Sequence, residues 1–253
     1  MNTSTCSRQG DIAFQTNLYN DPNPSRRHLH TTRRNWVTRE LSRYTRVPGT
    51  SVVEVGVGAG IYTRLLADRE CRIMAIDINT DFLNNICDLP DVTVMCADAT
   101  RDLGLRDYDV ALCSEVLEHV PPAESMGMLA TLYRSVRPGG IVILTTPQRM
   151  STMETMVRTL RFPPMLALAR RIYGQVDDLG HINVMRGSAL RAQVLATGFE
   201  IVQNTQVALY LPLLAEFGGE AGKRIATVLE RWITDTVFSA LLWQQCFVLR
   251  RPA

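Results

Sequence analysis

The sequence predicts an α/β fold in which a mostly parallel β-sheet is covered by helices on both faces. Two observations carry this prediction. Apolar, strand-like runs alternate with helical segments between about residues 50 and 147, which is the pattern of a parallel sheet with helical crossovers. With 253 residues, of which 46% are hydrophobic, the chain can bury one sizeable core as a single large domain with insertions.

The first elements lie before the predicted sheet. Residues 1–25 are polar and rich in turn-forming residues, so we expect a flexible arm there. Residues 25–46 have apolar side chains near helical spacing and predict a helix. Pro48-Gly49 ends that helix.

Five strand-like runs then alternate with helices. The strands are expected at 51–56, 72–77, 92–98, 109–114 and 141–147, and the helices at 61–69, 80–87 and 123–137.

After Pro147 the alternation changes. Residues 149–173 predict two short amphipathic helices separated by Pro163-Pro164. A helix at 185–198 and a sixth strand at 199–206 resume the earlier pattern, and a helical insert at about 213–237 precedes a terminal strand at 244–251.

Composition and charge exclude several classes of protein. The net charge of +2 gives no general attraction for nucleic acid. The six cysteines are scattered, without zinc-type spacing, so a reducing cytoplasm is the simplest compartment. The N-terminus lacks the apolar segment of a signal peptide. No run of about 18 apolar residues is present that would span a membrane.

A glycine-rich turn follows the first predicted strand and reads Glu54-Val55-Gly56-Val57-Gly58-Ala59-Gly60. Glycines at the mouth of a sheet let the backbone turn sharply and approach a ligand closely. The spacing is G-x-G-x-G, not the dinucleotide G-x-G-x-x-G. Glu54 stands just before the glycines, which suits a cationic ligand better than a pyrophosphate.

Two carboxylates at the ends of the next strands extend this site. Asp77 ends the second strand about 20 residues further on, where a carboxylate can accept from both hydroxyls of a ribose. Asp98 ends the third strand beside Ala99, in a position to accept from an adenine amino group.

At these positions the sequence resembles the class I S-adenosylmethionine-dependent methyltransferases. "VVEVGVGAG" is similar to their first motif, "AIDIN" to their ribose-binding segment, "CADAT" to their adenine segment and "SVRPGGIVILTTP" to the helix that leads into the fifth strand. The resemblance is close over residues 50–147 and looser over 181–203 and 244–251. It implies that S-adenosylmethionine contacts Glu54, Gly56, Gly58, Gly60, Asp77, Ile78, Asp98, Ala99 and Ser114.

The resemblance also implies the domain organisation. The fold would be a Rossmann-like sheet of seven strands whose last strand, at 244–251, is antiparallel. Residues 1–48 would form an arm and a helix that cover the cofactor and substrate. Residues 49–253 would form the methyltransferase domain, with helical lid insertions at about 149–180 and 213–237.

The stretch "CSEVLEHV", residues 113–120, carries Glu115, Glu118 and His119 at helical spacings of three and four. It looks most like the segment after the fourth strand in ubiquinone-biosynthesis O-methyltransferases and similar small-molecule enzymes. The same E-x-x-E-H pattern occurs in small-RNA 2′-O-methyltransferases, where a later histidine completes a divalent-metal site. The resemblance therefore implies Glu115, Glu118, His119 and His181 as a candidate ligand set.

The chemistry of this stretch leaves three alternatives open. His119 could act as general base on an acceptor hydroxyl. A cation held by two carboxylates and two imidazoles could instead lower the pKa of that hydroxyl. Mg²⁺ prefers oxygen ligands, so two imidazoles would also suit Mn²⁺, Fe²⁺ or Zn²⁺. In the third alternative Glu115 only organises the loop and His119 lines the pocket. The candidate catalytic residues are therefore His119, Glu115 and His181.

Segments outside the common core would build the acceptor pocket. Their aromatic and methionine side chains predict a small, partly apolar acceptor, and the residues concerned are Tyr19, Trp36, Met153, Met156, Phe162, Tyr173, Tyr210 and Trp232. Residues 149–173 hold five arginines and one glutamate, which predicts either a soluble lid or peripheral contact with a membrane.

The sequence thus predicts a cytoplasmic methyltransferase that acts on a small molecule, most simply at oxygen. The alternatives are RNA 2′-O-methylation, N- or C-methylation of a natural product or lipid-like acceptor, and a cofactor-binding protein without catalysis. DNA is not expected as a partner, and a long basic stripe or RNA-binding module is absent. The oligomeric state is not predicted.

Overall fold

A seven-stranded sheet forms the centre of the computed structural model, which describes residues 5–160 and 181–253. The strand order is β3-β2-β1-β4-β5-β7-β6. Pairing is parallel from β3 through β5, whereas β7 is antiparallel to both of its neighbours. The predicted sheet with an antiparallel last strand is therefore confirmed. The strands are β1 (Ser51–Val55), β2 (Arg72–Asp77), β3 (Val92–Cys96), β4 (Tyr108–Ser114), β5 (Val136–Pro147), β6 (Glu200–Val207) and β7 (Gln244–Arg250).

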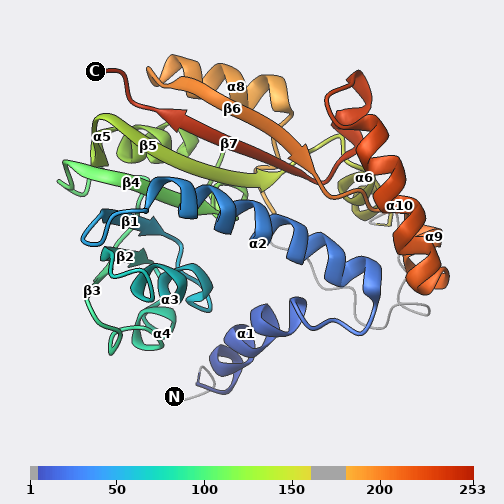
Figure 1. Cartoon of the computed structure of the whole chain (residues 1–253), viewed down its shortest axis with the longest axis horizontal. Coiled ribbons are helices and arrows are strands. Elements are labelled where there is room, and N and C mark those ends of the chain that lie inside the picture. The colour runs from blue at the N-terminus through green and yellow to red at the C-terminus, as the bar shows by residue number, and fades with distance from the viewer. Residues whose placement is uncertain (1–4, 161–180) are drawn as a thin grey trace.

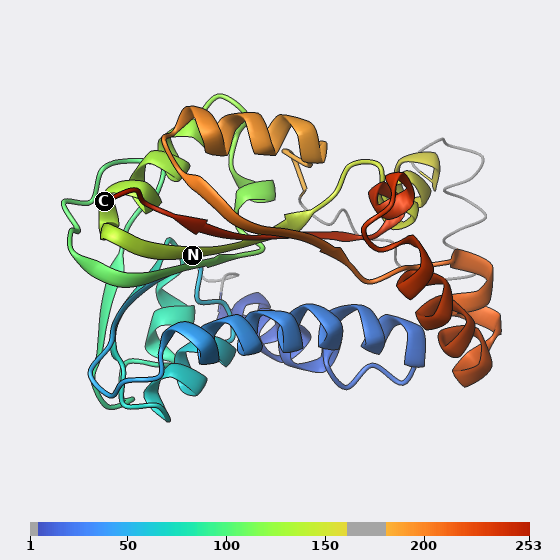
Figure 2. The same cartoon turned by 45° about the horizontal axis from the view of Figure 1, so that its top comes forward.

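Helices cover both faces of this sheet, as Figure 2 shows with the sheet seen nearly edge-on. One hydrophobic core joins α2 and α3 to the sheet through residues such as Trp36 and Leu66. The other joins α5 and α8 through residues such as Leu129 and Leu190. The helices of these layers are α2 (Pro24–Tyr44), α3 (Ile61–Ala67), α4 (Thr80–Asn84), α5 (Ser125–Ser135) and α8 (Gly187–Ala196).

Helix α2 begins where local sequence favours a start. The side chain of Asn23 accepts from the backbone N–H groups of Ser25 and Arg26, and Pro24 occupies the first turn, where its missing N–H costs nothing. The helix predicted at 25–46 is thus confirmed.

The expectation of a flexible arm at 1–25 is wrong, because residues Thr5–Leu18 form helix α1. A polar segment has little intrinsic reason to be helical in isolation. Here α1 lies against α2 and α4, and the Gln15 side chain accepts from the backbone N–H of Ala59 at 2.8 Å. Tertiary contacts that the sequence does not reveal therefore accompany this helix.

The inserted helices lie beyond the end of the sheet where β5 finishes (Figure 1). Helix α6 (Thr152–Leu160) follows β5, and the insert predicted at 213–237 forms α9 (Pro212–Phe217) and α10 (Gly219–Ile233), followed by the 3₁₀ turn η2 (Val237–Leu241). The second helix predicted within 149–173, with the Pro163-Pro164 break, lies outside the described residues.

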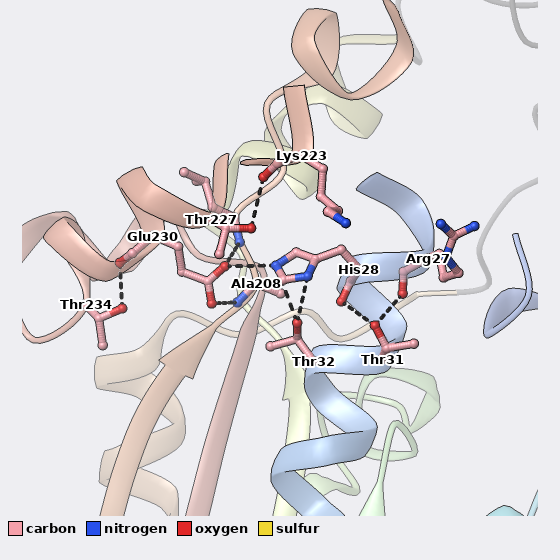
Figure 3. Close-up of polar contacts among 10 residues, drawn as sticks. Arg27, His28, Thr31, Thr32, Ala208, Lys223, Thr227, Glu230 and Thr234 are labelled. Atoms are coloured by element: carbon pink, nitrogen blue, oxygen red, sulfur yellow. Dashed lines mark hydrogen bonds and ion pairs between the residues drawn. The ribbon is translucent and has the colours of Figure 1, made fainter. Parts of the chain in front are cut away.

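The carboxylate of Glu230 connects α10 to the rest of the fold (Figure 3). Glu230 accepts from the backbone N–H groups of Ala208 at 2.9 Å and Leu209 at 3.2 Å, and its other contact is His28 Nε2 of α2 at 3.4 Å. The insert is therefore tied to α2 and to the end of β6. None of the helices within residues 5–160 and 181–253 carries an apolar run long enough to cross a bilayer.

Candidate active site

The glycine-rich turn lies between β1 and α3. Gly56, Gly58 and Gly60 all have positive φ, between 50° and 77°. A Cβ atom at Gly58 would come within 2.4 Å of Gln15 Oε1, so a side chain there would be strained by its backbone conformation and would displace the Gln15 side chain of α1. The N-terminal segment thus lies close to the turn, as a helix and not as the expected flexible arm.

Glu54 lies beneath this turn and is almost completely buried, with 1% exposure. Its Oε2 accepts from the Thr63 hydroxyl at 2.8 Å, whereas Oε1 has no hydrogen-bond partner within residues 5–160 and 181–253. Burial raises the pKa of Glu54 to about 8, and the nearby Asp77 carboxylate contributes in the same direction. A cation near the turn would favour the ionised form of this carboxyl.

Asp77 ends β2 as predicted, and its carboxylate faces the glycine turn. One oxygen accepts from the N–H of Asn79 at 2.9 Å, and the other lies 3.4 Å from the N–H of Gly58. The next side chain, Ile78, is 75% exposed. An acidic group and an apolar surface therefore stand side by side at the carboxyl end of the sheet.

Asp98 and Ala99 lie just past β3, which ends at Cys96 and not at Asp98 as expected. Ala99 is buried. The carboxylate of Asp98 accepts from the N–H and the hydroxyl of Thr100, and these bonds lower its pKa. This exposed carboxylate therefore carries its charge while keeping acceptor positions for a ligand.

The structure separates Glu115 from Glu118 and His119, so the expected single helical face is wrong. Residue 115 has φ = 59°, which turns the chain immediately after β4, and only Leu117–His119 form one 3₁₀ turn, η1. The Glu115 carboxylate accepts from Arg33 Nη1 and Gln244 Nε2, each at 2.7 Å.

Ser114 belongs to the same polar network. Its hydroxyl lies 2.9 Å from the hydroxyl of Thr145, which is 3.1 Å from Glu115 Oε1. A carboxylate only accepts, so Thr145 donates to Glu115 and Ser114 donates to Thr145. Glu115 thus joins α2, β5 and β7, and it is not part of the group that the other three predicted metal ligands form.

Glu118, His119 and His181 do come together. Their potential ligand atoms all lie within 4.8 Å of one another, and the two imidazole rings are 5.3 Å apart, centroid to centroid. Glu118 is fully buried. Its Oε2 accepts from the Thr146 hydroxyl, and its Oε1 has no hydrogen-bond partner among the residues that the structure describes. Burial, with the Glu115 charge, raises the pKa of Glu118 well above its usual value.

These features fit a divalent cation. One carboxylate and two imidazoles form a donor set that Zn²⁺, Fe²⁺ or Mn²⁺ accepts readily and Mg²⁺ accepts less readily. The unpartnered buried oxygen of Glu118 is the atom that such a cation would satisfy. Within the described residues, three of the four predicted ligands therefore form a metal-compatible group, and Glu115 is the exception.

Glu154 is a site residue that the sequence did not indicate. It lies in the first turn of α6, and its Oε1 is 3.2 Å from His181 Nδ1. The pattern Ser151-Thr152-Met153-Glu154 matches a helix capping box, so its sequence suggests a purely local role. Only the fold brings Glu154 to His181, 27 residues further along the chain.

The side chains expected to line the acceptor pocket have different surroundings. Trp36 and Tyr210 are core residues, with 3% and 2% exposure. Trp232 is 78% exposed on α10. Met153 and Met156 pack against the small core around Tyr210. Tyr19 lies against Arg34 and His30, and the two remaining residues, Phe162 and Tyr173, lie outside the described residues.

Comparison with known proteins agrees with the geometry. A family model described as a methyltransferase domain matches residues 25–204. The chain is 30% identical over 212 residues to a ubiquinone biosynthesis O-methyltransferase of Burkholderia thailandensis, covering 78% of this chain and 84% of that protein.

Solved structures share the fold. Magnesium protoporphyrin IX methyltransferase from Synechocystis PCC 6803 with bound SAH (S-adenosylhomocysteine) has a TM-score of 0.62 at 17% identity, covering 99% of this chain and 95% of that one. An N-methyltransferase from Bradyrhizobium japonicum in complex with S-adenosylhomocysteine has a TM-score of 0.60 at 16% identity, with full coverage of both chains. Since the family model spans well over half of the sequence, this chain belongs to the class I S-adenosylmethionine-dependent methyltransferases.

Proposed function

We propose that this methyltransferase transfers the methyl group of S-adenosylmethionine to a hydroxyl oxygen of a small, partly apolar acceptor. The observation that carries the proposal is the Glu118–His119–His181 cluster. Two of its members, Glu118 and His119, lie in the segment after β4, which is close to the glycine turn because a Cβ at Gly56 would clash with the side chain of Val116. The similarity to a ubiquinone biosynthesis O-methyltransferase supports oxygen as the methylated atom.

The proposed cofactor-binding site lies at the carboxyl ends of β1 to β4. Asp77 would hold the ribose hydroxyls, Ile78 and Ala99 would face the adenine, and Asp98 would accept from its amino group. Arg33 or Arg34 of α2 could reach the cofactor carboxylate. When bound, S-adenosylmethionine supplies an electrophilic methyl group on a sulfonium, and Glu54 beneath the turn favours that positive charge.

The cluster supplies the means to activate a hydroxyl. His119 would accept the proton that leaves the acceptor oxygen as the carbon–oxygen bond forms and the carbon–sulfur bond breaks. If a divalent cation is present, Glu118, His119 and His181 would hold it, and it would make the acceptor hydroxyl more acidic. In either case these residues also fix the acceptor oxygen in line with the methyl group.

A direct test uses the full chain, S-adenosylmethionine and a panel of catechol-type phenols of increasing apolar substitution, with S-adenosylhomocysteine formation as the readout. We expect turnover with the apolar phenols and a loss of about 100-fold or more in His119→Ala, since a positioned base contributes roughly 10²–10⁴-fold. Glu124→Gln, an exposed carboxyl before α5, is the matched control and should retain activity.

Two outcomes would contradict parts of the proposal. Turnover only with amine acceptors would exclude oxygen as the target, and salt-sensitive methylation of RNA alone would exclude a small molecule. Treatment with a chelator distinguishes the two roles of the cluster. If activity is lost on chelation and restored by added Mn²⁺ or Zn²⁺, the reaction requires a cation. If activity is unchanged, His119 alone accepts the proton.

Peripheral membrane contact through 149–173 is a further part of this proposal. In the described portion of this segment, Met153 and Met156 of α6 pack inward against the core around Tyr210. Residues 161–173 lie outside the described residues. Vesicle co-sedimentation should decrease when Arg158, Arg161, Arg170 and Arg171 are changed to Glu. Equal co-sedimentation of this variant and the wild type would leave the segment as a soluble lid.

A further inference from the structure

We propose that Glu154 is a positioning residue that fixes the imidazole of His181 within the Glu118–His119–His181 cluster. The inference rests on the proposed function of that cluster. It assigns a task to a side chain outside the E-x-x-E-H stretch, at the start of the helix that follows β5.

The contact between the two side chains is close and shielded from water. Glu154 Oε1 lies 3.2 Å from His181 Nδ1, and the side chains are only 7% and 13% exposed. A carboxylate accepts and does not donate, so the hydrogen of this bond resides on Nδ1, and in a neutral imidazole the lone pair then resides on Nε2. Because the two nitrogens lie on different edges of the ring, Nε2 is left as the nitrogen that can face Glu118 and His119.

The backbone beside His181 is held separately from its ring. The N–H groups of Ile182 and Asn183 both donate to the carbonyl of Glu118 at 2.9 Å. The Asn183 side chain also donates to the carbonyl of Leu117 at 3.4 Å. These bonds place the chain at residue 181 next to η1, but they leave rotation of the imidazole about its side-chain bonds undetermined. Glu154 supplies that restraint.

Glu154 is itself directed toward His181 by the start of α6. Its backbone N–H donates to the Ser151 hydroxyl at 3.1 Å, as in a capping box. In such a box the glutamate side chain would turn back to the N–H of Ser151. Here that N–H donates to the carbonyl of Gln148, and the glutamate contacts His181. A carboxylate on the far nitrogen of a ligand imidazole fixes its tautomer and increases its basicity.

The test combines a metal titration with a measurement on the metal-free protein. Co²⁺ is titrated into the full chain and followed by its visible absorption. We expect Glu154→Ala to weaken Co²⁺ binding by about 10- to 100-fold. Glu154→Gln should restore most of the affinity, since its amide oxygen can still accept from Nδ1–H. Met153→Ala, which loosens the packing of the same helix against the Tyr210 core, is the matched control and should bind Co²⁺ like the wild type.

The second readout is the ¹⁵N chemical shift of the His181 ring, measured without metal on protein labelled at histidine. Only four histidines are present, and His181→Gln assigns the signal. We expect a protonated Nδ1 in the wild type and in Glu154→Gln, and a mixture of tautomers in Glu154→Ala. Unchanged ring shifts in Glu154→Ala, or equal loss of Co²⁺ affinity in Met153→Ala, would overturn the inference. If the wild type binds no Co²⁺ but the shifts change as expected, Glu154 keeps its positioning role and the metal part of the proposed function fails.

Discussion

Replacement of Glu115 by alanine should destabilise the protein strongly while leaving the metal-compatible cluster intact. The carboxylate lies 2.7 Å from Arg33 Nη1, and the side chains are 19% and 8% exposed. Removing one partner of a buried ion pair leaves the other charge uncompensated and costs about 3–5 kcal/mol. For a domain of this size, 1 kcal/mol lowers Tm by about 2–4 °C, so the expected decrease is roughly 6–20 °C.

Two further variants show how much of the loss of stability arises from the uncompensated charge. Glu115→Gly should be less harmful than Glu115→Ala by about 1 kcal/mol, because glycine adopts the positive φ of this position without steric cost. The double variant Arg33→Met/Glu115→Met should recover much of the stability, since an apolar pair leaves no buried charge without a partner.

The assay is thermal unfolding of the cofactor-free protein together with Co²⁺ titration of each folded variant. Glu115→Ala should bind Co²⁺ as the wild type does, whereas Glu118→Ala should lose most of its affinity. The reasoning would be refuted if Glu115→Ala unfolded at the wild-type temperature, or if it lost Co²⁺ binding as completely as Glu118→Ala does.

Three other predictions concern the cofactor side of the site. The pKa of Glu54 is about 8 in the folded protein against 4.5 normally, so between these pH values the unfolded chain releases this proton and the folded protein keeps it. As the pH rises from 4.5 to about 8, the free energy of unfolding of the wild type should therefore fall relative to that of Glu54→Gln, by up to ~1.4 kcal/mol per pH unit. Urea unfolding at pH 5, 6.5 and 8 measures this, and parallel curves would exclude it. Gln15→Ala should weaken S-adenosylhomocysteine binding about fivefold in calorimetry, the equivalent of one neutral hydrogen bond, whereas Thr16→Ala on the same helix should not; equal values would place α1 outside the cofactor site. Asp77→Ala should weaken S-adenosylhomocysteine binding by at least tenfold through lost ribose contacts, whereas the control Asp88→Asn should bind like the wild type. Wild-type affinity in Asp77→Ala would show that Asp77 is not part of the site.

The local features of the fold and of the candidate cofactor site were predictable from sequence because they depend on neighbours in the chain. Strand and helix periodicity placed the elements of the sheet, and the start of α2 follows from Asn23 and Pro24. The glycine turn and Asp77 lie at the carboxyl ends of adjacent parallel strands, so their proximity follows once the order of strands and helices is known. The family followed from the same motifs.

The tertiary structure alone decided which side chains meet across the sheet. A positive φ at residue 115 sends Glu115 to Arg33 of α2 and Gln244 of β7, 82 and 129 residues away, while Glu118 turns to Thr146. The helicity of α1 and the contact between Glu154 and His181 likewise accompany long-range packing. Spacing along a chain specifies a face only while the backbone stays regular. Where a strand ends, a single residue with positive φ points its side chain in a new direction. The elements packed around that residue then determine its partner.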